Sequence, residues 1–303
     1  MRFFNTEGPV RPDMHYCLPP LYRWDLGEVL QLIEQQKYFL LHAPRQTGKT
    51  SCLLALMAHL NGEGRYRAVY ANLEIAQTAR EDVPRGMRAV CGAIASAADL
   101  YLSEERLFDW TDALWPGYGA DGVLNGLLKR WSRESPQPLV LLLDEVDALV
   151  GDTLISLLRQ LRAGYTQRPE AFPSTVVLCG VRDLRDYRIH ASSEASPITG
   201  GSAFNIKAKS LRLGDFDAAE VATLLGQHTA ETGQAFAPEA LARVWELTRG
   251  QPWLVNALAY EACFEIREGR ERTRPIDVGL IDRAKFSGPH VQDRMSSSLS
   301  CAG

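Results

Sequence analysis

The segment APRQTGKT, from Ala43 to Thr50, combines residue types and a spacing that suit phosphate binding. In such a loop the backbone N–H groups surround a phosphate, and Gly48 lets the backbone come close to the anion. Lys49 can reach the β- and γ-phosphates of a nucleotide, and the Thr50 hydroxyl can hold Mg²⁺. Alanine stands where the strict pattern begins with glycine, a departure that the wider pattern tolerates. The expected nucleotide-binding residues are Ala43, Pro44, Arg45, Gln46, Thr47, Gly48, Lys49, Thr50 and Ser51.

A second segment, VLLLDE from Val140 to Glu145, places two carboxylates directly after an apolar run that is typical of a buried strand. Ligands bind at the carboxyl edge of a parallel sheet, so both carboxylates are candidates for chemistry. We expect Asp144 to hold the Mg²⁺ shell, and Glu145 to orient and deprotonate an attacking water. The alternative is that these acids belong to the cap of the next helix, where Asp147 and Asp152 could also serve.

The elements that would position these motifs alternate between apolar strands and amphipathic helices. Such alternation predicts an α/β fold, with one parallel sheet covered by helices on both faces. The segment WPGYGADG, 115–122, predicts a turn. The expected strands are YFLLHA at 38–43, RAVYANL at 67–73, the run from Pro138, STVVLCGVRD from Ser174, and SLRLGDF around Leu211.

The character of the chain changes after Gly214, where helix signals replace strand signals. Asp217 with Glu220 predicts a capping box, while Pro238 and Pro252 predict two further helix starts. We expect four parts along the chain: an N-terminal arm at 1–24, a core at 25–210, a helical lid domain at 211–285, and a disordered Ser-rich tail at 286–303.

Composition narrows the class of protein. Of the 303 residues, 46% are hydrophobic and 23% charged, which excludes a disordered or disulfide-scaffold chain. The net charge of −4 provides no general attraction for nucleic acid, so any such contact needs a local basic patch. The N-terminus lacks an apolar signal core, and no apolar run approaches the roughly 18 residues of a membrane span. These features predict a cytoplasmic protein that does not contact a membrane.

One predicted strand, RAVYANL, lies between the strand of the phosphate loop and the acidic strand. In this order the sequence resembles the P-loop ATPases of the AAA+/STAND group, and more narrowly the bacterial AAA-like domain proteins and archaeal-type ATPases. The resemblance covers about residues 16 to 260. It implies a three-layer P-loop NTPase core of the additional-strand, catalytic-glutamate type, followed by a small α-helical lid.

Three weaker matches to the same group assign functional roles to further residues. TVVLCGVRD resembles a strand that ends in a sensor residue, so that Arg182 would reach the γ-phosphate and act in catalysis with Glu145 and Lys49. TRGQPWLVNAL resembles the lid segment whose proline lies near the base, which assigns Pro252 to adenine. LPPLYRWDL resembles a G-R-[DE] stretch that lines the adenine pocket; Tyr22 replaces its glycine, whereas Arg23 and Asp25 remain. The alternatives are a solvated basic loop at Arg182 and an ordinary helix-starting proline at Pro252.

The resemblance implies a Mg²⁺-dependent ATPase that binds ATP and Mg²⁺ and switches between core and lid. Two other interpretations remain open: a nucleotide-gated signalling or scaffold module that hydrolyses slowly or not at all, and a DNA-handling AAA+ ATPase. Self-association, a protein partner and an arginine supplied in trans also remain open.

Overall fold

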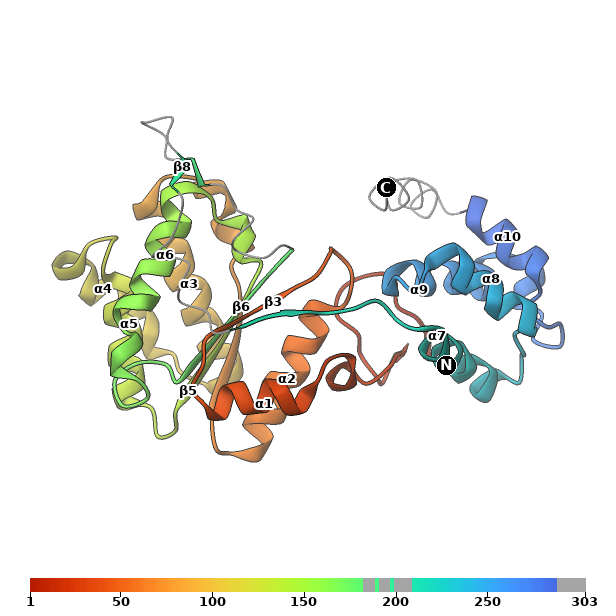
Figure 1. The fold of residues 1–303 in the computed structure, drawn as a ribbon, viewed down its shortest axis with the longest axis horizontal. Helices are drawn as coiled ribbons and strands as arrows, with labels where there is room; N and C mark the ends of the chain where they lie inside the picture. Colours follow the sequence, from red (N-terminus) through yellow and green to blue (C-terminus); the bar gives the residue numbers. More distant parts are fainter. Residues whose placement is uncertain (182–188, 191–196, 199–208, 288–303) are drawn as a thin grey trace. The chain divides into compact units, whose positions relative to one another are not determined.

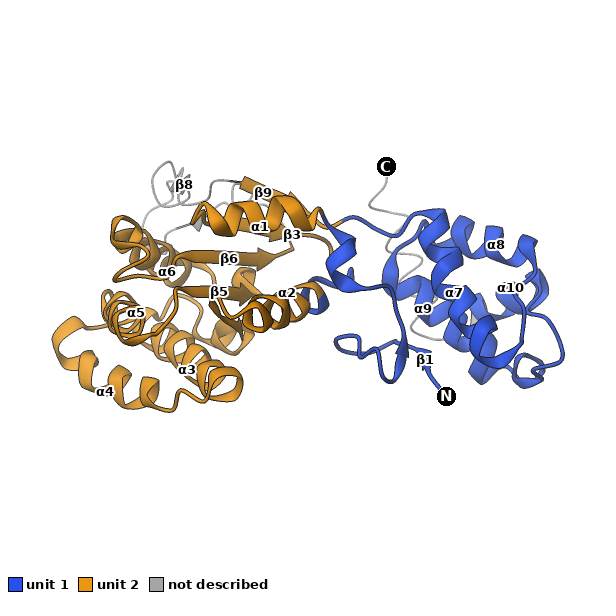
Figure 2. Ribbon diagram, turned by 90° about the horizontal axis from the view of Figure 1, so that it is seen from below, with its two compact units in different colours: residues 1–24, 45–51, 214–303 blue, residues 25–44, 52–213 orange. Residues whose placement is uncertain are grey.

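The computed structural model describes residues 1–181, 189–190, 197–198 and 209–287. Arg182 and residues 288–303 of the predicted tail therefore lie outside the described residues. The chain forms two compact units (Figure 2). Residues 25–44 and 52–213 form one, called here the sheet unit, and residues 1–24, 45–51 and 214–303 form the other, called the helical unit. Residues 45–51, most of the phosphate loop, group with the helical unit.

The sheet unit is built on five parallel strands in the order β4-β5-β6-β3-β9. The first four strands in this order are short, largely apolar and mostly buried runs, as expected for strands covered on both faces, whereas β9 at the edge is polar and exposed or half-buried. The α/β architecture predicted from the sequence is therefore confirmed. The strands are β3 (Phe39–His42), β4 (Arg67–Asn72), β5 (Leu139–Asp144), β6 (Thr175–Gly180) and β9 (Lys209–Arg212). A separate antiparallel pair joins β7 (Ile189–His190) to β8 (Pro197–Ile198).

Helices cover both faces of this sheet, which makes three layers (Figures 1 and 2). On one face α1 and α2 pack; on the other, α3, α5 and α6 share a core with alternate strand residues such as Val69, Leu141 and Leu178. The helices are α1 (Leu26–Glu34), α2 (Lys49–Glu63), α3 (Val83–Leu102), α4 (Arg106–Tyr118), α5 (Val123–Glu134) and α6 (Gly151–Ala163). Short 3₁₀ helices are η2 (Glu74–Ala79), η3 (Val146–Ala148) and η4 (Tyr165–Gln167).

The turn predicted at 115–122 begins later than expected. Helix α4 continues through Pro116 to Tyr118 and ends at Gly119, whose φ is +60°. The last turn of the helix persists because Trp115 packs partly buried against the core, and the guanidinium of Arg88 lies 4.0 Å from its ring centre. Tertiary packing thus overrides the local preference of proline for a helix boundary.

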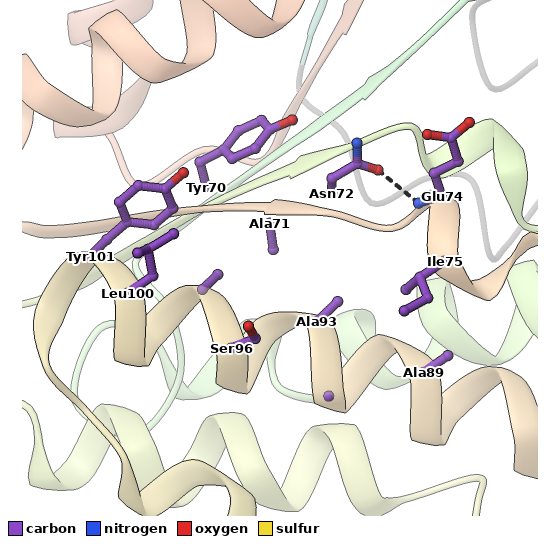
Figure 3. Close-up of a pocket in the computed structure, with 12 residues that line it drawn as sticks. Tyr70, Ala71, Asn72, Glu74, Ile75, Ala89, Ala93, Ser96, Leu100 and Tyr101 are labelled. Carbon is purple, nitrogen blue, oxygen red and sulfur yellow. Dashed lines mark hydrogen bonds between the residues drawn. The ribbon is translucent and has the colours of Figure 1, made fainter.

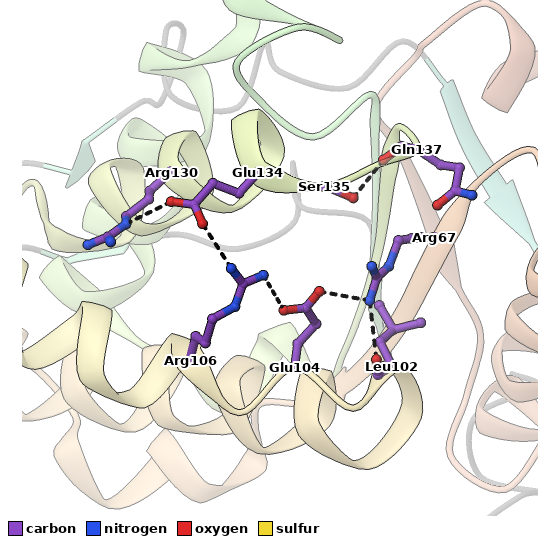
Figure 4. A network of polar contacts seen from close by, with 8 residues as sticks. All are labelled: Arg67, Leu102, Glu104, Arg106, Arg130, Glu134, Ser135 and Gln137. Atoms are coloured by element: carbon purple, nitrogen blue, oxygen red, sulfur yellow. Dashed lines mark hydrogen bonds and ion pairs between the residues drawn. The ribbon is translucent and has the colours of Figure 1, made fainter.

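An ion-pair network joins β4 to helices α4 and α5 through a largely buried carboxylate (Figure 4). The two oxygens of Glu104 lie 3.0 Å from Arg67 and 2.9 Å from Arg106. Arg106 continues to Glu134, which also pairs with Arg130 one turn earlier on α5. Two cationic neighbours offset the cost of burying Glu104, so the network fixes the end of α3 against the sheet.

The helical unit contains the predicted helical segment and the N-terminal arm. The capping box of Asp217 and Glu220 is confirmed at the start of α7. The helices are α7 (Ala218–Thr232), α8 (Pro238–Thr248), α9 (Pro252–Tyr260), a π-helical turn η6 (Glu261–Glu265), η7 (Glu268–Arg270) and α10 (Val278–Ser287). No helix in the described part of the chain is long and apolar enough to cross a membrane.

The arm is attached to these helices by its aromatic side chains. It forms a short parallel pair, β1 (Phe3–Phe4) with β2 (His15–Tyr16), and a 3₁₀ turn, η1 (Pro20–Arg23). Phe4 and Tyr16 are fully buried in one apolar cluster with residues of α7 to α10. The arm is therefore packed into the core of the helical unit, although its sequence shows no sustained hydrophobic periodicity.

Candidate functional site

The phosphate loop leaves the sheet after β3 and leads directly into α2. Ala43 is buried, and its N–H donates to the carbonyl of Gly180 at the end of β6. Within the loop, Gln46 and Gly48 have φ angles of +62° and +92°. Two left-handed residues reverse the backbone in this short segment, and the glycine is needed where an L side chain would be strained. Helix α2 begins at Lys49.

The lysine of this loop is withdrawn from solvent. Lys49 is 5% exposed, and Thr47 is also buried, whereas Arg45 and Gln46 are exposed. An ammonium group interacts more strongly with phosphate where water is partly excluded. A buried lysine at the first turn of a helix, next to amides that can bind an anion, suits phosphate binding.

Within the helical unit, the arm and the N-cap residue of α9 both bond to the phosphate loop. Arg23 donates from Nη1 to the carbonyl of Thr47 at 3.2 Å. Gln251 donates from Nε2 to the carbonyl of Gln46 at 3.3 Å. The N–H of Val10 donates to Oγ of Ser51 at 3.0 Å. The loop is therefore held from two directions by residues that are distant in the sequence.

The residues predicted to contact the adenine base, Tyr22, Arg23 and Pro252, differ in their burial and in their contacts. Arg23 also donates from Nη2 to the carbonyl of Gly214 at 2.6 Å, and its guanidinium lies 4.3 Å from the ring centre of Phe216. Tyr22 is 78% exposed. Pro252 is buried at the first position of α9. Their contact with a base stays a prediction.

The acidic end of β5 lies in the sheet unit. Asp144 is fully buried; its Oδ1 accepts from the N–H of Glu145 at 2.9 Å, and its Oδ2 accepts from Oη of Tyr70 at 3.1 Å. Glu145 itself has a φ of +54°, which a non-glycine residue rarely adopts. Such local strain is often found where a side chain must be held for function.

The capping alternative for these acids does not match the structure. The N-cap of α6 is Val150, which makes no side-chain capping bond, and Glu145 occupies the N-cap position of the separate 3₁₀ turn η3 without making a side-chain capping bond. Asp147 in that turn instead accepts from the N–H of Val181 at 3.4 Å. Asp147 thus joins the turn after β5 to the end of β6.

The ends of β3, β5 and β6 all lie at the carboxyl edge of one parallel sheet, with β6 between the other two. In such sheets ligands bind at this edge. Oxygen donors suit Mg²⁺, and both the carboxylate of Asp144 and the hydroxyl of Thr50 supply oxygen. The donor chemistry of Asp144 and Thr50 therefore fits a magnesium ion.

Reasoning from the sequence missed Tyr70, Gln251 and Val10. One signal for Tyr70 is the alternation of side chains along the strand RAVYANL. It places Tyr70 on the same face of the strand as Asn72, the polar residue at the strand's end. No local signal singles out Gln251 or Val10, because their loop contacts join segments that are distant in the sequence.

A groove of about 670 Å³ lies elsewhere on the sheet unit, between β4, η2 and α3 (Figure 3). Its lining is mostly apolar and small, and it includes the exposed side chains of Ile75 and Leu100. Glu74 is the single charged residue among those that line it. The groove therefore lacks the convergent polar groups of a reaction site.

A parallel sheet in this order, a phosphate loop between β3 and α2, and an acidic pair after β5 together define a P-loop ATPase fold of the AAA+ type. Residues 27–268 match the model of the family described as AAA-like domain. The chain belongs to this AAA-like domain family. No curated protein matches the chain.

Solved structures share this fold at low sequence identity. A Walker-type ATPase of Pyrococcus abyssi is similar with a TM-score of 0.59 and 14% identity, over 99% of this chain and 80% of the other. Cdc6p from Pyrobaculum aerophilum is similar with a TM-score of 0.56 and 18% identity, over 84% of this chain. The match spans 62% of the length of Cdc6p.

Proposed function

We propose that this protein binds ATP with Mg²⁺ and hydrolyses the γ-phosphate. The observation that carries the proposal is the pair of motifs that follow two strands of one parallel sheet: a glycine-containing loop after β3 that leads into α2 at the buried Lys49, and the buried Asp144 followed by Glu145 at the end of β5. Membership of the AAA-like domain family supports it.

Each residue would have a distinct role. The amides of the phosphate loop and Lys49 would bind the β- and γ-phosphates, while Thr50 and Asp144 would hold Mg²⁺. Glu145 would orient the attacking water and accept its proton. Arg182 would stabilise charge on the γ-phosphate, and Tyr22, Arg23 and Pro252 would lie around the adenine. When bound, Mg²⁺ would neutralise charge on the phosphate oxygens.

Binding would also be communicated to the lid helices. Arg23 and Gln251 bond to successive carbonyls of the phosphate loop, and Gln251 is also the N-cap of α9, where Oε1 accepts from the N–H of Leu254 at 2.6 Å. A change of loop conformation on binding phosphate would alter both contacts. We propose that this connection drives a nucleotide-dependent switch.

Phosphate release measured with wild type, Glu145→Gln and Lys49→Ala tests the proposal. Glu145→Gln should bind ATP with unchanged affinity and lose about 100-fold in turnover, because only the proton acceptor is removed. Lys49→Ala should weaken ATP binding by about tenfold or more in calorimetry, because a charge-assisted phosphate contact is lost.

Equal turnover by wild type and Glu145→Gln would exclude the glutamate as the base. Unchanged affinity in Lys49→Ala would exclude phosphate binding by this loop. Tight ATP binding by a wild type that releases no phosphate would favour the nucleotide-gated module over the enzyme.

A further inference from the structure

Tyr70 contacts the carboxylate of Asp144 from the neighbouring strand. Its Oη lies 3.1 Å from Oδ2 of Asp144, and the bond is buried, since Tyr70 is 8% exposed and Asp144 is fully buried. A hydrogen bond from a neutral hydroxyl to a carboxylate is stronger than one between neutral groups, and burial shields it from competing water.

The register of the sheet creates this contact. Asn72 on β4 is paired with Asp144 on β5, and Tyr70 is paired with Leu142. Side chains two residues apart point to the same face of a strand, so Tyr70 is the diagonal neighbour of Asp144. A tyrosine is long enough to cover that diagonal distance, and its hydroxyl reaches the carboxylate at the end of the next strand.

The two oxygens of Asp144 are thereby held separately. Oδ1 accepts from the N–H of Glu145 and Oδ2 accepts from Tyr70. Bonds to both oxygens fix the rotation of the carboxylate about its terminal torsion, which is otherwise broad. The orientation in which the carboxylate would face a metal ion or its waters is therefore set in part by a residue of β4.

We propose that Tyr70 is a positioning residue for the Mg²⁺-binding carboxylate Asp144. This inference rests on the proposed function, since it assigns Tyr70 to the metal part of the same site. Tyr70 touches neither the nucleotide nor the metal in this role; it raises the affinity for Mg²⁺ by holding Asp144 in one orientation. Groups that orient metal ligands in this way affect metal affinity by about 10- to 100-fold in other proteins.

The substitution Tyr70→Phe tests the proposal, because it removes one oxygen and keeps the ring that packs in the sheet. The probe is a fluorescent, non-hydrolysable ATP analogue, titrated against the full-length protein at a series of Mg²⁺ concentrations and in EDTA. Half-saturation by Mg²⁺ should require about tenfold more Mg²⁺ in Tyr70→Phe than in wild type. Affinity for the analogue in EDTA should change by less than about twofold.

Two controls separate positioning from general structural damage. Tyr101→Phe removes a hydroxyl from α3, where it makes no contact with Asp144, and should leave the Mg²⁺ dependence unchanged. Asp144→Asn should remove most of the Mg²⁺ dependence. In the double variant, Tyr70→Phe should then add less than about twofold, because the two residues act through one carboxylate.

An unchanged Mg²⁺ requirement in Tyr70→Phe would overturn the inference, as would an equal loss of affinity in Mg²⁺ and in EDTA, or additive effects in the double variant. The proposed function fails separately, if wild type binds the analogue neither with Mg²⁺ nor in EDTA. A wild type that binds while Tyr70→Phe behaves identically leaves the proposed function intact and removes only the role of Tyr70.

Discussion

Arg23 connects the N-terminal arm, the phosphate loop and Gly214, three segments that are distant in the sequence. Its two terminal nitrogens donate to the carbonyls of Thr47 and Gly214, and its planar face lies against Phe216. The planar, forked guanidinium can make these contacts together, whereas a lysine ammonium is a point donor on a flexible stem. The arginine is therefore specified by geometry as much as by charge.

Arg23→Lys should weaken binding of the ATP analogue by about fivefold, because one of two carbonyl bonds and the contact with the ring of Phe216 are lost. Calorimetry measures the change, and the melting temperature should fall with it. Arg11→Lys in the exposed part of the arm is the matched control and should change neither quantity. Equal affinities for Arg23→Lys and wild type would show that the loop is held without this side chain.

At the scale of elements, the outer edge of β4 is closed by a side chain of α2. The N–H and carbonyl of Ala68 point away from β5, and Asn61 bonds to both, with Oδ1 accepting at 2.7 Å and Nδ2 donating at 2.9 Å. The amide thus substitutes for the missing neighbouring strand. A covered edge resists pairing with another chain.

Asn61→Ala should lower the free energy of unfolding by about 1 to 3 kcal/mol, because it leaves a backbone donor and a backbone acceptor unsatisfied at a part-buried edge. Urea denaturation measures the loss, and light scattering should report more aggregation. Glu63→Ala on the same helix serves as the control, since its contact with His59 is a surface pair whose side chains are 39% and 31% exposed, and such pairs contribute little. A stability equal to wild type would mean that water replaces Asn61 without cost.

At the scale of the whole molecule, the arm adds aromatic residues to the core of the helical unit. His228 is fully buried there, beside Phe4 and Tyr16. Gln234 donates to the carbonyl of Gly269 from Nε2 and accepts from Arg272 at Oε1, so Nε2 of His228 must be the donor to that oxygen at 2.9 Å. Nδ1 of His228 then carries no proton and has no partner among the described residues.

Burial lowers the pKa of His228 below its ordinary value of 6.5, and the charge of Arg272 lowers it further. The folded protein therefore binds this proton less readily than the unfolded chain does. The contribution of neutral His228 to the free energy of unfolding is fully present above the pKa of the unfolded chain, and it is lost as the pH falls through the lower pKa of the folded protein. Burial also lowers the pKa of His15 in the arm, with the same sign. The contact of Arg2 with Glu231 lowers the pKa of that carboxyl and acts at more acidic pH.

The melting temperature should consequently fall between pH 7 and pH 5, and the fall should be smaller in His228→Gln, which keeps a hydrogen-bond donor and does not titrate. Scanning calorimetry at matched ionic strength measures both proteins. A pH dependence of the same size in His228→Gln would assign the effect to other groups. Lowered stability of the variant at pH 7 does not affect this comparison, because only the slope with pH is compared.

The sequence by itself determined the α/β class, the strand before the phosphate loop, and the acidic strand end with Asp144 and Glu145. These features are local: apolar periodicity and short motifs are fixed by neighbouring residues, so they can be recognised without coordinates. The turn at 115–122 was placed too early because a proline signal cannot account for the packing of Trp115.

Only the tertiary structure decided which residues support those motifs. Tyr70 reaches Asp144 because strand register sets one residue diagonally to another, and Arg23 and Gln251 reach the phosphate loop from segments far away in the sequence. A one-residue change of register would turn Tyr70 to the opposite face of the sheet. Contacts of this kind depend on the packing of whole elements, whereas the motifs depend on their own few residues.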